Sequence, residues 1–252
     1  MNAVILTGAS RGLGLALATD LALAGTTVVG VARKESEGWC ALAARCPGSV
    51  HFIAADLSSA GALSALMPAA LAALSGQRLR TLALINNAGV VTPVARVGEA
   101  DPAQTAAALH INLLAPMVLT GDFIRLSEGL ADDRRVLNIS SGAAVKTLPG
   151  WAVYGATKAG LDHYTRHAAA EAAQRGKGLR VVSLYPGVVD TDMQATIRSS
   201  DPDAFPDRPA FEALKRDGGL ASPADTARRI VTYLFAPSFG STPVDDIRTA
   251  SA

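Results

Sequence analysis

The chain has 252 residues, of which 49% are hydrophobic and 18% are charged, and its formal net charge is +1. This length can bury the core of one α/β domain, so we expect a single domain over residues 1–252. The near-zero charge, with no block of Lys and Arg, argues against a nucleic acid or a membrane surface as partner, because both usually require a clustered basic face.

The sequence carries no sign of a targeting segment, a disulfide or a metal site. The first six residues, MNAVIL, lack a basic region and read as a strand, and no apolar run reaches the roughly 18 residues that span a bilayer. Cys40 and Cys46 fall in one expected helix where their side chains would not meet. His163 and His167 lack a Glu or Cys at metal-ligand spacing. We therefore expect a cytoplasmic protein without a metal.

Short aliphatic runs alternate with longer Ala/Leu-rich segments along the whole chain, which indicates repeated βαβ units. In chain order, strands are expected at about 2–7, 27–32, 49–54, 80–86, 134–139, 179–185 and 243–247. Helices are expected near 12–24, 37–45, 58–75, 101–128, 151–175 and 222–236. The pattern predicts a Rossmann-like, doubly wound, seven-stranded parallel sheet with helices on both faces.

One stretch interrupts this alternation. Residues 194–219 carry Pro202, Pro206 and Pro209 between the end of a strand and the last helix. Ligands of such sheets bind at the carboxyl ends of the strands, so a long irregular connection there predicts a substrate lid.

A glycine-rich turn follows the first strand and opens a helix, with the sequence Thr7-Gly8-Ala9-Ser10-Arg11-Gly12-Leu13-Gly14. Free N–H groups and the helix dipole at such a turn favour a pyrophosphate. The second strand ends at Arg33 without the acid that would bind the ribose diol of NAD. Arg33 and Arg11 instead match a 2′-phosphate in charge and geometry, which predicts NADPH over NADH.

Tyr154 and Lys158 lie four residues apart in an expected helix and so share a face. The Lys158 ammonium is expected to lower the pKa of the Tyr154 phenol from its reference of roughly 10. Ser141, in a neighbouring loop, supplies a hydroxyl to hold a substrate oxygen. The three side chains suit proton transfer to a carbonyl oxygen.

Further polar residues follow the expected strands in a fixed order: Asp56, then Asn86-Asn87-Ala88-Gly89, Asn112, and Pro186-Gly187 to Thr191. Together with the glycine-rich turn, Ser141, Tyr154 and Lys158, they make the chain resemble the short-chain dehydrogenase/reductase family over nearly its whole length. The resemblance implies an NADP-dependent oxidoreductase that acts on CH–OH and C=O groups.

The resemblance also assigns roles. Asn112, Ser141, Tyr154 and Lys158 would be catalytic, with Ser140 the lesser candidate, and Asn112 would kink its helix and hold a water beside Lys158. The residues that would bind the adenosine and pyrophosphate are Gly8, Ser10, Arg11, Gly12, Leu13, Gly14, Arg33, Asp56 and Leu57. The residues that would bind the nicotinamide half are Asn87, Ala88, Gly89, Tyr154, Lys158, Pro186, Gly187, Val189 and Thr191.

Residues 150–154 and 185–194 resemble the branch that holds sepiapterin reductases and the bacterial benzil reductases that form (S)-benzoin. That branch acts on vicinal dicarbonyl compounds, and the apolar residues around the site favour an aromatic, benzil-type ketone over a pterin. The expected substrate contacts are Ser141, Ala143, Leu148, Trp151, Tyr154, Met193 and Asp245, with Asp246 as the alternative to Asp245.

A regulator that senses NADPH without chemistry is the alternative from another functional class, because a fold alone does not fix function. The presence of all four catalytic residue types argues against it. The resemblance further implies a homodimer or homotetramer that pairs through the helices near 101–128 and 151–175.

Overall fold

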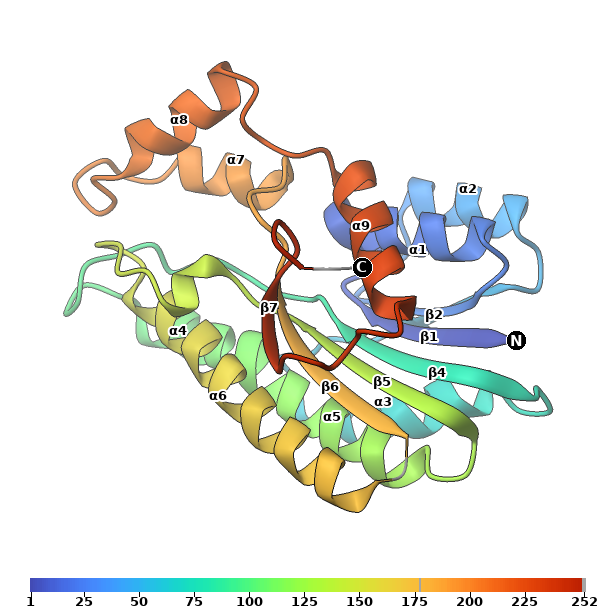
Figure 1. Ribbon diagram of the computed structural model, residues 1–252. Coiled ribbons are helices and arrows are strands. Elements are labelled where there is room, and N and C mark those ends of the chain that lie inside the picture. Colours follow the sequence, from blue (N-terminus) through green and yellow to red (C-terminus); the bar gives the residue numbers. More distant parts are fainter. Residues whose placement is uncertain (177, 251–252) are drawn as a thin grey trace.

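The computed structural model describes residues 1–176 and 178–250. Seven parallel strands form one sheet in the order β3-β2-β1-β4-β5-β6-β7 (Figure 1). The strands are β1 (Asn2–Thr7), β2 (Thr27–Ala32), β3 (Val50–Ala54), β4 (Leu79–Asn86), β5 (Ala131–Ile139), β6 (Leu179–Tyr185) and β7 (Val244–Asp246). The predicted doubly wound sheet is confirmed, and its order reverses between β1 and β4, where such sheets bind ligands.

Helices cover both faces of the sheet (Figure 1). One face packs against α1 (Gly12–Leu23), α2 (Glu37–Arg45) and α9 (Pro223–Phe235), and the other against α3 (Ala60–Ala72), α5 (Ala115–Leu126) and α6 (Ala152–Arg175). In β1, Val4 and Leu6 join the first layer while Ala3 and Ile5 join the second. Each strand is therefore apolar on both sides, which explains the near-continuous hydrophobic runs in the sequence.

The expectation of a single regular α-helix near 101–128 is wrong, because a π-helical turn interrupts it. α4 (Pro102–Leu109) and α5 are joined by a π-helical turn, His110–Leu114, which contains Asn112. Such a turn adds one residue to the ordinary α-helical repeat and is frequent at functional sites. Here it directs Asn112, which is fully buried, toward the loop after β4.

The continuous run Pro102–Leu126 is long and apolar enough to cross a membrane by length and composition, with a mean hydropathy of 1.4. The expectation that no such run exists was therefore wrong. Its inner face, which includes Ala115, Leu119 and Phe123, is fully buried against the sheet. We interpret it as a core helix, since the layer that it forms is continuous with α3 and α6.

The proposed lid is more ordered than the proline content suggested. Instead of an irregular loop, it contains α7 (Asp192–Arg198) and α8 (Arg208–Arg216), which lie at the upper left of Figure 1. Pro209 stands in the first turn of α8, where proline is compatible with a helix because its missing N–H has no partner there. An ion pair of 3.0 Å between Arg208 and Glu212 supports the same helix.

A buried ion network attaches the end of α9 to the sheet. Arg135 donates to the Leu234 carbonyl, to the Ala236 carbonyl at 3.0 Å and to Asp133 at 2.7 Å. Arg180 binds the other oxygen of Asp133 at 2.8 Å. Partial burial opposes ionisation of Asp133, but the two arginines outweigh it and hold the pKa of this carboxyl below its usual value.

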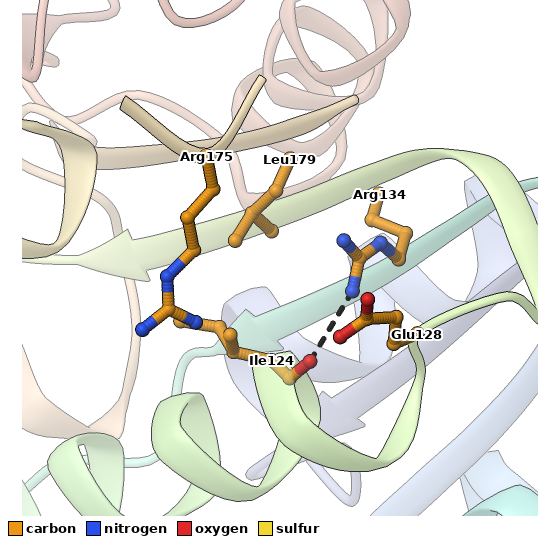
Figure 2. A pocket seen from close by; sticks show the side chains of 5 residues that line it. All are labelled: Ile124, Glu128, Arg134, Arg175 and Leu179. Atoms are coloured by element: carbon orange, nitrogen blue, oxygen red, sulfur yellow. Dashed lines mark hydrogen bonds between the residues drawn. The ribbon is translucent and has the colours of Figure 1, made fainter. Parts of the chain in front are cut away.

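At the amino ends of β5 and β6, a cavity of about 340 Å³ is lined by Ile124, Glu128, Arg134, Arg175 and Leu179 (Figure 2). Arg134 is buried there and donates to the Ile124 carbonyl at 3.2 Å, in the last turn of α5. A cation at a helix C-terminus complements the helix dipole. This cavity lies at the edge of the sheet opposite to the one where a doubly wound sheet binds ligands.

We predict that Arg135→Ala lowers the free energy of unfolding by about 3 kcal/mol or more, because it leaves two buried carbonyls without their donor and removes one cation from Asp133. Urea unfolding followed by circular dichroism measures this loss. The matched control is Arg125→Ala, which removes an exposed ion pair with Asp122 and should cost less than about 1 kcal/mol. Similar losses in both variants would contradict the proposed importance of the network.

Candidate active site

The glycine-rich turn forms a cradle between β1 and α1. Gly8 has φ +69°, and a Cβ at Gly14 would lie 2.0 Å from the Gly8 carbonyl oxygen, so neither position accepts a side chain. Helix α1 begins at Gly12, with no acidic residue in its first turn and no side-chain cap from Arg11. Its first N–H groups are thus available to an anion, and the cradle fits a dinucleotide pyrophosphate.

The loop after β4 braces this turn. The Thr7 hydroxyl accepts hydrogen bonds from the N–H groups of Asn87 at 3.0 Å and Ala88 at 3.1 Å. The Asn87 amide donates in return to the Thr7 carbonyl at 3.0 Å. A Cβ at Gly8 would meet the Ala88 Cα at 2.9 Å, so the two segments are in close contact. The structure therefore brings Asn87 and Ala88 to the turn, as the sequence predicts.

The adenosine end of the expected cofactor site holds Arg33 and Asp56, both exposed. Hydrogen bonds from Ser58 lower the pKa of Asp56, with a smaller contribution from the charge of Arg33. Leu57 is buried beside them. Arg11, in the glycine-rich turn, is exposed and forms an ion pair of 3.1 Å with Asp192 of α7. The Ser36 hydroxyl donates to the Ser10 carbonyl at 2.6 Å, so the turn that carries Arg11 contacts the segment after Arg33.

Tyr154 and Lys158 lie on the inner face of α6 and are almost completely buried. The Lys158 ammonium donates to the Ile139 carbonyl at 2.8 Å and lies 5.9 Å from the centre of the Tyr154 ring. Burial lowers the pKa of Lys158 to about 8, while the charge of Asp162, one turn further along α6, opposes that shift.

The pKa of Tyr154 departs from the expectation. Burial raises it above its ordinary value, and a hydrogen bond with Ser141 opposes the rise only in part. The prediction that Lys158 lowers this pKa was therefore wrong, because the cost of charging a buried phenol exceeds the stabilisation from nearby groups. A phenol that keeps its proton at neutral pH is suited to donate it.

Ser141 stands next to Tyr154 and caps the short 3₁₀ turn Gly142–Ala144. Its hydroxyl accepts from the Ala143 N–H at 3.1 Å and remains able to donate. Ser140 is buried, and its hydroxyl has no partner among the described residues. Ser141 is close enough to Tyr154 to lower the pKa of its phenol, which favours Ser141 over Ser140 as the substrate-holding serine.

Asn112 holds the loop after β4 against the catalytic helix. Its side chain accepts from the Val90 N–H and donates to the Val90 carbonyl, both at 2.8 Å, and donates to Thr157 on α6 at 3.2 Å. A Cβ at Gly89 would lie 3.4 Å from the Asn112 oxygen and 3.7 Å from the Lys158 nitrogen. The structure thus places Asn112, Gly89 and Lys158 together, and it adds a bracing role for Asn112.

The loop from Pro186 to Thr191 completes the site. Gly187 has φ +77°, and Val189 forms a bridge with Ala221, which fixes the loop near the start of α9. A Cβ at Gly12 would lie 3.3 Å from the Thr191 methyl group. The loop after β6 therefore reaches back to the glycine-rich turn, and the two predicted halves of the cofactor site are contiguous.

An apolar cluster covers the catalytic end of α6. Trp151 stacks on Phe205 of the lid segment with ring centres 5.0 Å apart, and it also contacts Phe211 of α8 and Tyr154. The expected substrate contacts Ala143, Leu148, Trp151, Tyr154 and Met193 all belong to this cluster. The sequence analysis missed Phe205 and Phe211, whose only signal was two aromatic residues in the proline-bearing segment.

Asp245 does not join this cluster. Its carboxylate accepts from the Tyr233 hydroxyl of α9 at 2.9 Å, on the face of the sheet opposite to α6. Asp246 forms an ion pair with Arg248. Adjacent residues of a strand point to opposite faces, so Asp245 follows its partner Leu184 toward α9. The predicted contact of Asp245 with the substrate was therefore wrong.

Comparison with known proteins places the chain among oxidoreductases. The family model described as short chain dehydrogenase matches residues 2–202. Benzil reductase ((S)-benzoin forming) of Bacillus cereus is 37% identical over 239 residues, which cover 95% of this chain and 96% of that protein. Sepiapterin reductase of Xenopus laevis is 33% identical, with 94% of this chain and 92% of that protein covered.

Solved structures agree with this relationship. The 3-ketoacyl-(acyl-carrier-protein) reductase of Brucella melitensis, complexed with NADH, has a TM-score of 0.78 and 25% identity, with 97% of this chain and 96% of that chain covered. A protein of Beutenbergia cavernae with bound NADP has a TM-score of 0.79 and 26% identity, covering 98% and 94%. Because both dinucleotides occur among these neighbours, cofactor choice must be argued from this chain's own residues.

We predict that Gly14→Ala weakens dinucleotide binding by roughly tenfold or more, because the new Cβ would displace the Gly8 carbonyl from the turn. Titration of NADPH fluorescence measures the dissociation constant. Gly121→Ala in α5, where a Cβ meets nothing within 4 Å, is the matched control and should bind like the wild type. A folded Gly14→Ala variant with wild-type affinity would show that the turn does not contact the cofactor.

Proposed function

The chain belongs to the short chain dehydrogenase family, and from that premise we propose that it is an NADPH-dependent reductase of aromatic or other vicinal dicarbonyl compounds of the benzil type. The observation that carries the proposal is that Tyr154 and Lys158 are buried with Ser141 beside Tyr154, and that Tyr154 packs in an aromatic cluster. The first group supplies proton transfer, and the second supplies an apolar surface for the substrate.

The roles of the chain's own residues follow from their contacts. A nicotinamide dinucleotide, when bound at the glycine-rich turn, supplies hydride to the carbonyl carbon. Tyr154 donates its phenolic proton to the carbonyl oxygen, which the Ser141 hydroxyl holds by a hydrogen bond. The Lys158 ammonium, 5.9 Å from the ring centre, stabilises the phenolate that remains. A positioned proton donor of this kind contributes roughly 10² to 10⁴ in rate.

The benzil-type substrate is supported by the aromatic cluster and by the relatives. Trp151, Phe205 and Phe211 pack on one another and make the catalytic end of α6 strongly apolar, which suits an aromatic ketone. The Bacillus relative is named as a benzil reductase. A sepiapterin-type activity is the alternative that the other relatives suggest. It is disfavoured because, of the two carboxylates expected to hold a pterin, Asp245 is bound by Tyr233 on the other face of the sheet and Asp246 is paired with Arg248.

The remaining properties are proposed on narrower grounds. A non-catalytic NADPH sensor is disfavoured, since it has no use for a buried lysine and a proton-donating tyrosine. We propose a cytoplasmic location, in keeping with two free cysteines. Leu109, Leu114 and Met117 are exposed along the α4–α5 flank, which supports pairing into a homodimer or homotetramer. A monomeric mass in light scattering would contradict that pairing.

The substrate proposal is tested by NADPH oxidation at 340 nm with benzil, 1-phenyl-1,2-propanedione and sepiapterin in turn. We expect turnover of the two aromatic diketones in preference to sepiapterin. Tyr154→Phe, which removes only the proton donor, should lose about 10²-fold or more of kcat while NADPH binding remains measurable. Inactivity toward all three substrates would overturn the substrate class, and near wild-type turnover in Tyr154→Phe would overturn the mechanism.

Cofactor choice has its own test. If Arg33 binds the 2′-phosphate, the wild type should bind NADPH more tightly than NADH, and Arg33→Ala should reduce that preference by roughly tenfold while leaving NADH affinity nearly unchanged. Dissociation constants from fluorescence titration at fixed ionic strength measure both. Lys146→Ala is the control variant. It removes one positive charge, as Arg33→Ala does, but from the loop between β5 and α6. Equal affinities of the wild type for NADPH and NADH would contradict the proposal that Arg33 binds the 2′-phosphate.

A further inference from the structure

Asp162 is a buried carboxylate on the catalytic helix. It lies on α6 one turn after Lys158, with only 2% of its surface exposed. Its two oxygens accept short hydrogen bonds of 2.6 Å, one from the Ser183 hydroxyl and one from the Tyr185 hydroxyl, both on β6. Every contact of this carboxylate thus lies between the catalytic helix and the strand that leads into the loop Pro186–Thr191.

The charge of Asp162 has no arginine or lysine in direct contact among the described residues. Ser183 and Tyr185 satisfy its hydrogen-bonding capacity but bring no positive charge. Burial together with the adjacent carboxylate raises the pKa of Tyr185, so that its hydroxyl keeps the proton that it donates. A carboxylate buried in this way is costly unless a cation lies near it.

Lys158, four residues earlier, lies on the same buried face of α6 as Asp162. The Lys158 ammonium is itself buried, and its polar neighbours from other elements, the Ile139 carbonyl and the Asn112 amide, are uncharged. On α6 it faces the neutral Tyr154 and the charged Asp162. The charges near Tyr185 are those of Arg166 on α6, which is exposed, and Asp246 on β7. Asp162 is therefore the negative group that offsets the burial of Lys158.

We propose that Asp162 is a positioning residue of the reductase site: its buried carboxylate keeps the Lys158 ammonium charged, and its bond to Tyr185 fixes the loop after β6 to the catalytic helix. The proposal rests on the function proposed above. It explains why a charged side chain lies buried one turn beyond the catalytic lysine. Sequence reasoning missed Asp162, although its spacing of four residues from Lys158 was visible.

The test compares the wild type with Asp162→Asn, which keeps the shape of the side chain and removes its charge, while one of the two acceptor oxygens becomes a donor NH2. Loss of the negative charge should lower the pKa of Lys158 further, so a larger fraction of the amine is neutral above pH 7. We expect the alkaline limb of the kcat profile for benzil reduction to move about one pH unit lower, with kcat at pH 7.5 reduced roughly threefold to tenfold. Thermal unfolding confirms that each variant is folded.

A second readout does not depend on turnover. The affinity for NADPH is measured by fluorescence from pH 6 to 10. The dissociation constant should begin to rise at a lower pH in Asp162→Asn than in the wild type, because Lys158 is expected to contact the nicotinamide ribose. If no dicarbonyl is reduced by the wild type, the proposed function fails, yet this titration still tests Asp162. Two control variants separate charge from structure: Tyr185→Phe, which keeps the carboxylate, and Asp225→Asn, an exposed aspartate of α9.

The outcomes are distinct. The proposal is supported if the pH profiles of kcat and of the NADPH dissociation constant both shift in Asp162→Asn, while the alkaline limb of the kcat profile does not move in Tyr185→Phe or in Asp225→Asn. A folded Asp162→Asn variant with wild-type profiles overturns it. Equal losses in Asp162→Asn and Tyr185→Phe without any pH shift would also overturn it, because they would reduce Asp162 to a packing residue.

Discussion

The whole site depends on holding a lysine ammonium inside the protein. Lys158 is nearly inaccessible, and burial alone would drive it to the neutral form. The structure meets this cost with the carbonyl at the end of β5, which accepts from the ammonium, and with the carboxylate one turn along α6. Each of these belongs to a different element, so the position of the ammonium ties the catalytic helix to the centre of the sheet.

The same arrangement explains why the phenol beside it stays protonated. Both groups are buried, and burial favours the neutral phenol while it disfavours the charged amine. A neutral donor with a cation nearby is ready to give up its proton as negative charge develops on a substrate oxygen. The glycine-rich turn and the loop after β6 meet at Gly12 and Thr191, so the expected hydride source and the proton donor share one edge of the sheet.

Most of the fold follows from the sequence because strand and turn signals are local. The apolar runs, the glycine-rich turn and the catalytic residues are each specified by neighbours in the chain. What sequence reasoning missed depends on tertiary contacts: the π-helical turn at Asn112, the two helices of the lid, and Phe205 packed on Trp151. The error at Asp245 has the same origin, because one residue of register in a three-residue strand decides which face a side chain points to.

The strand order also dictates how this protein must assemble. β1 pairs with β2 on one side and with β4 on the other, and β4 does not begin until Leu79. The central pairing of the sheet therefore joins residues that are far apart in the sequence. Such contacts form slowly, because the entropy of closing the long loop is lost before the contacts stabilise the chain. During synthesis, the cradle at Gly8 stays open until the segment that carries Asn87 and Ala88 has emerged and docked. The cofactor cradle is therefore complete only once β4 has paired with β1.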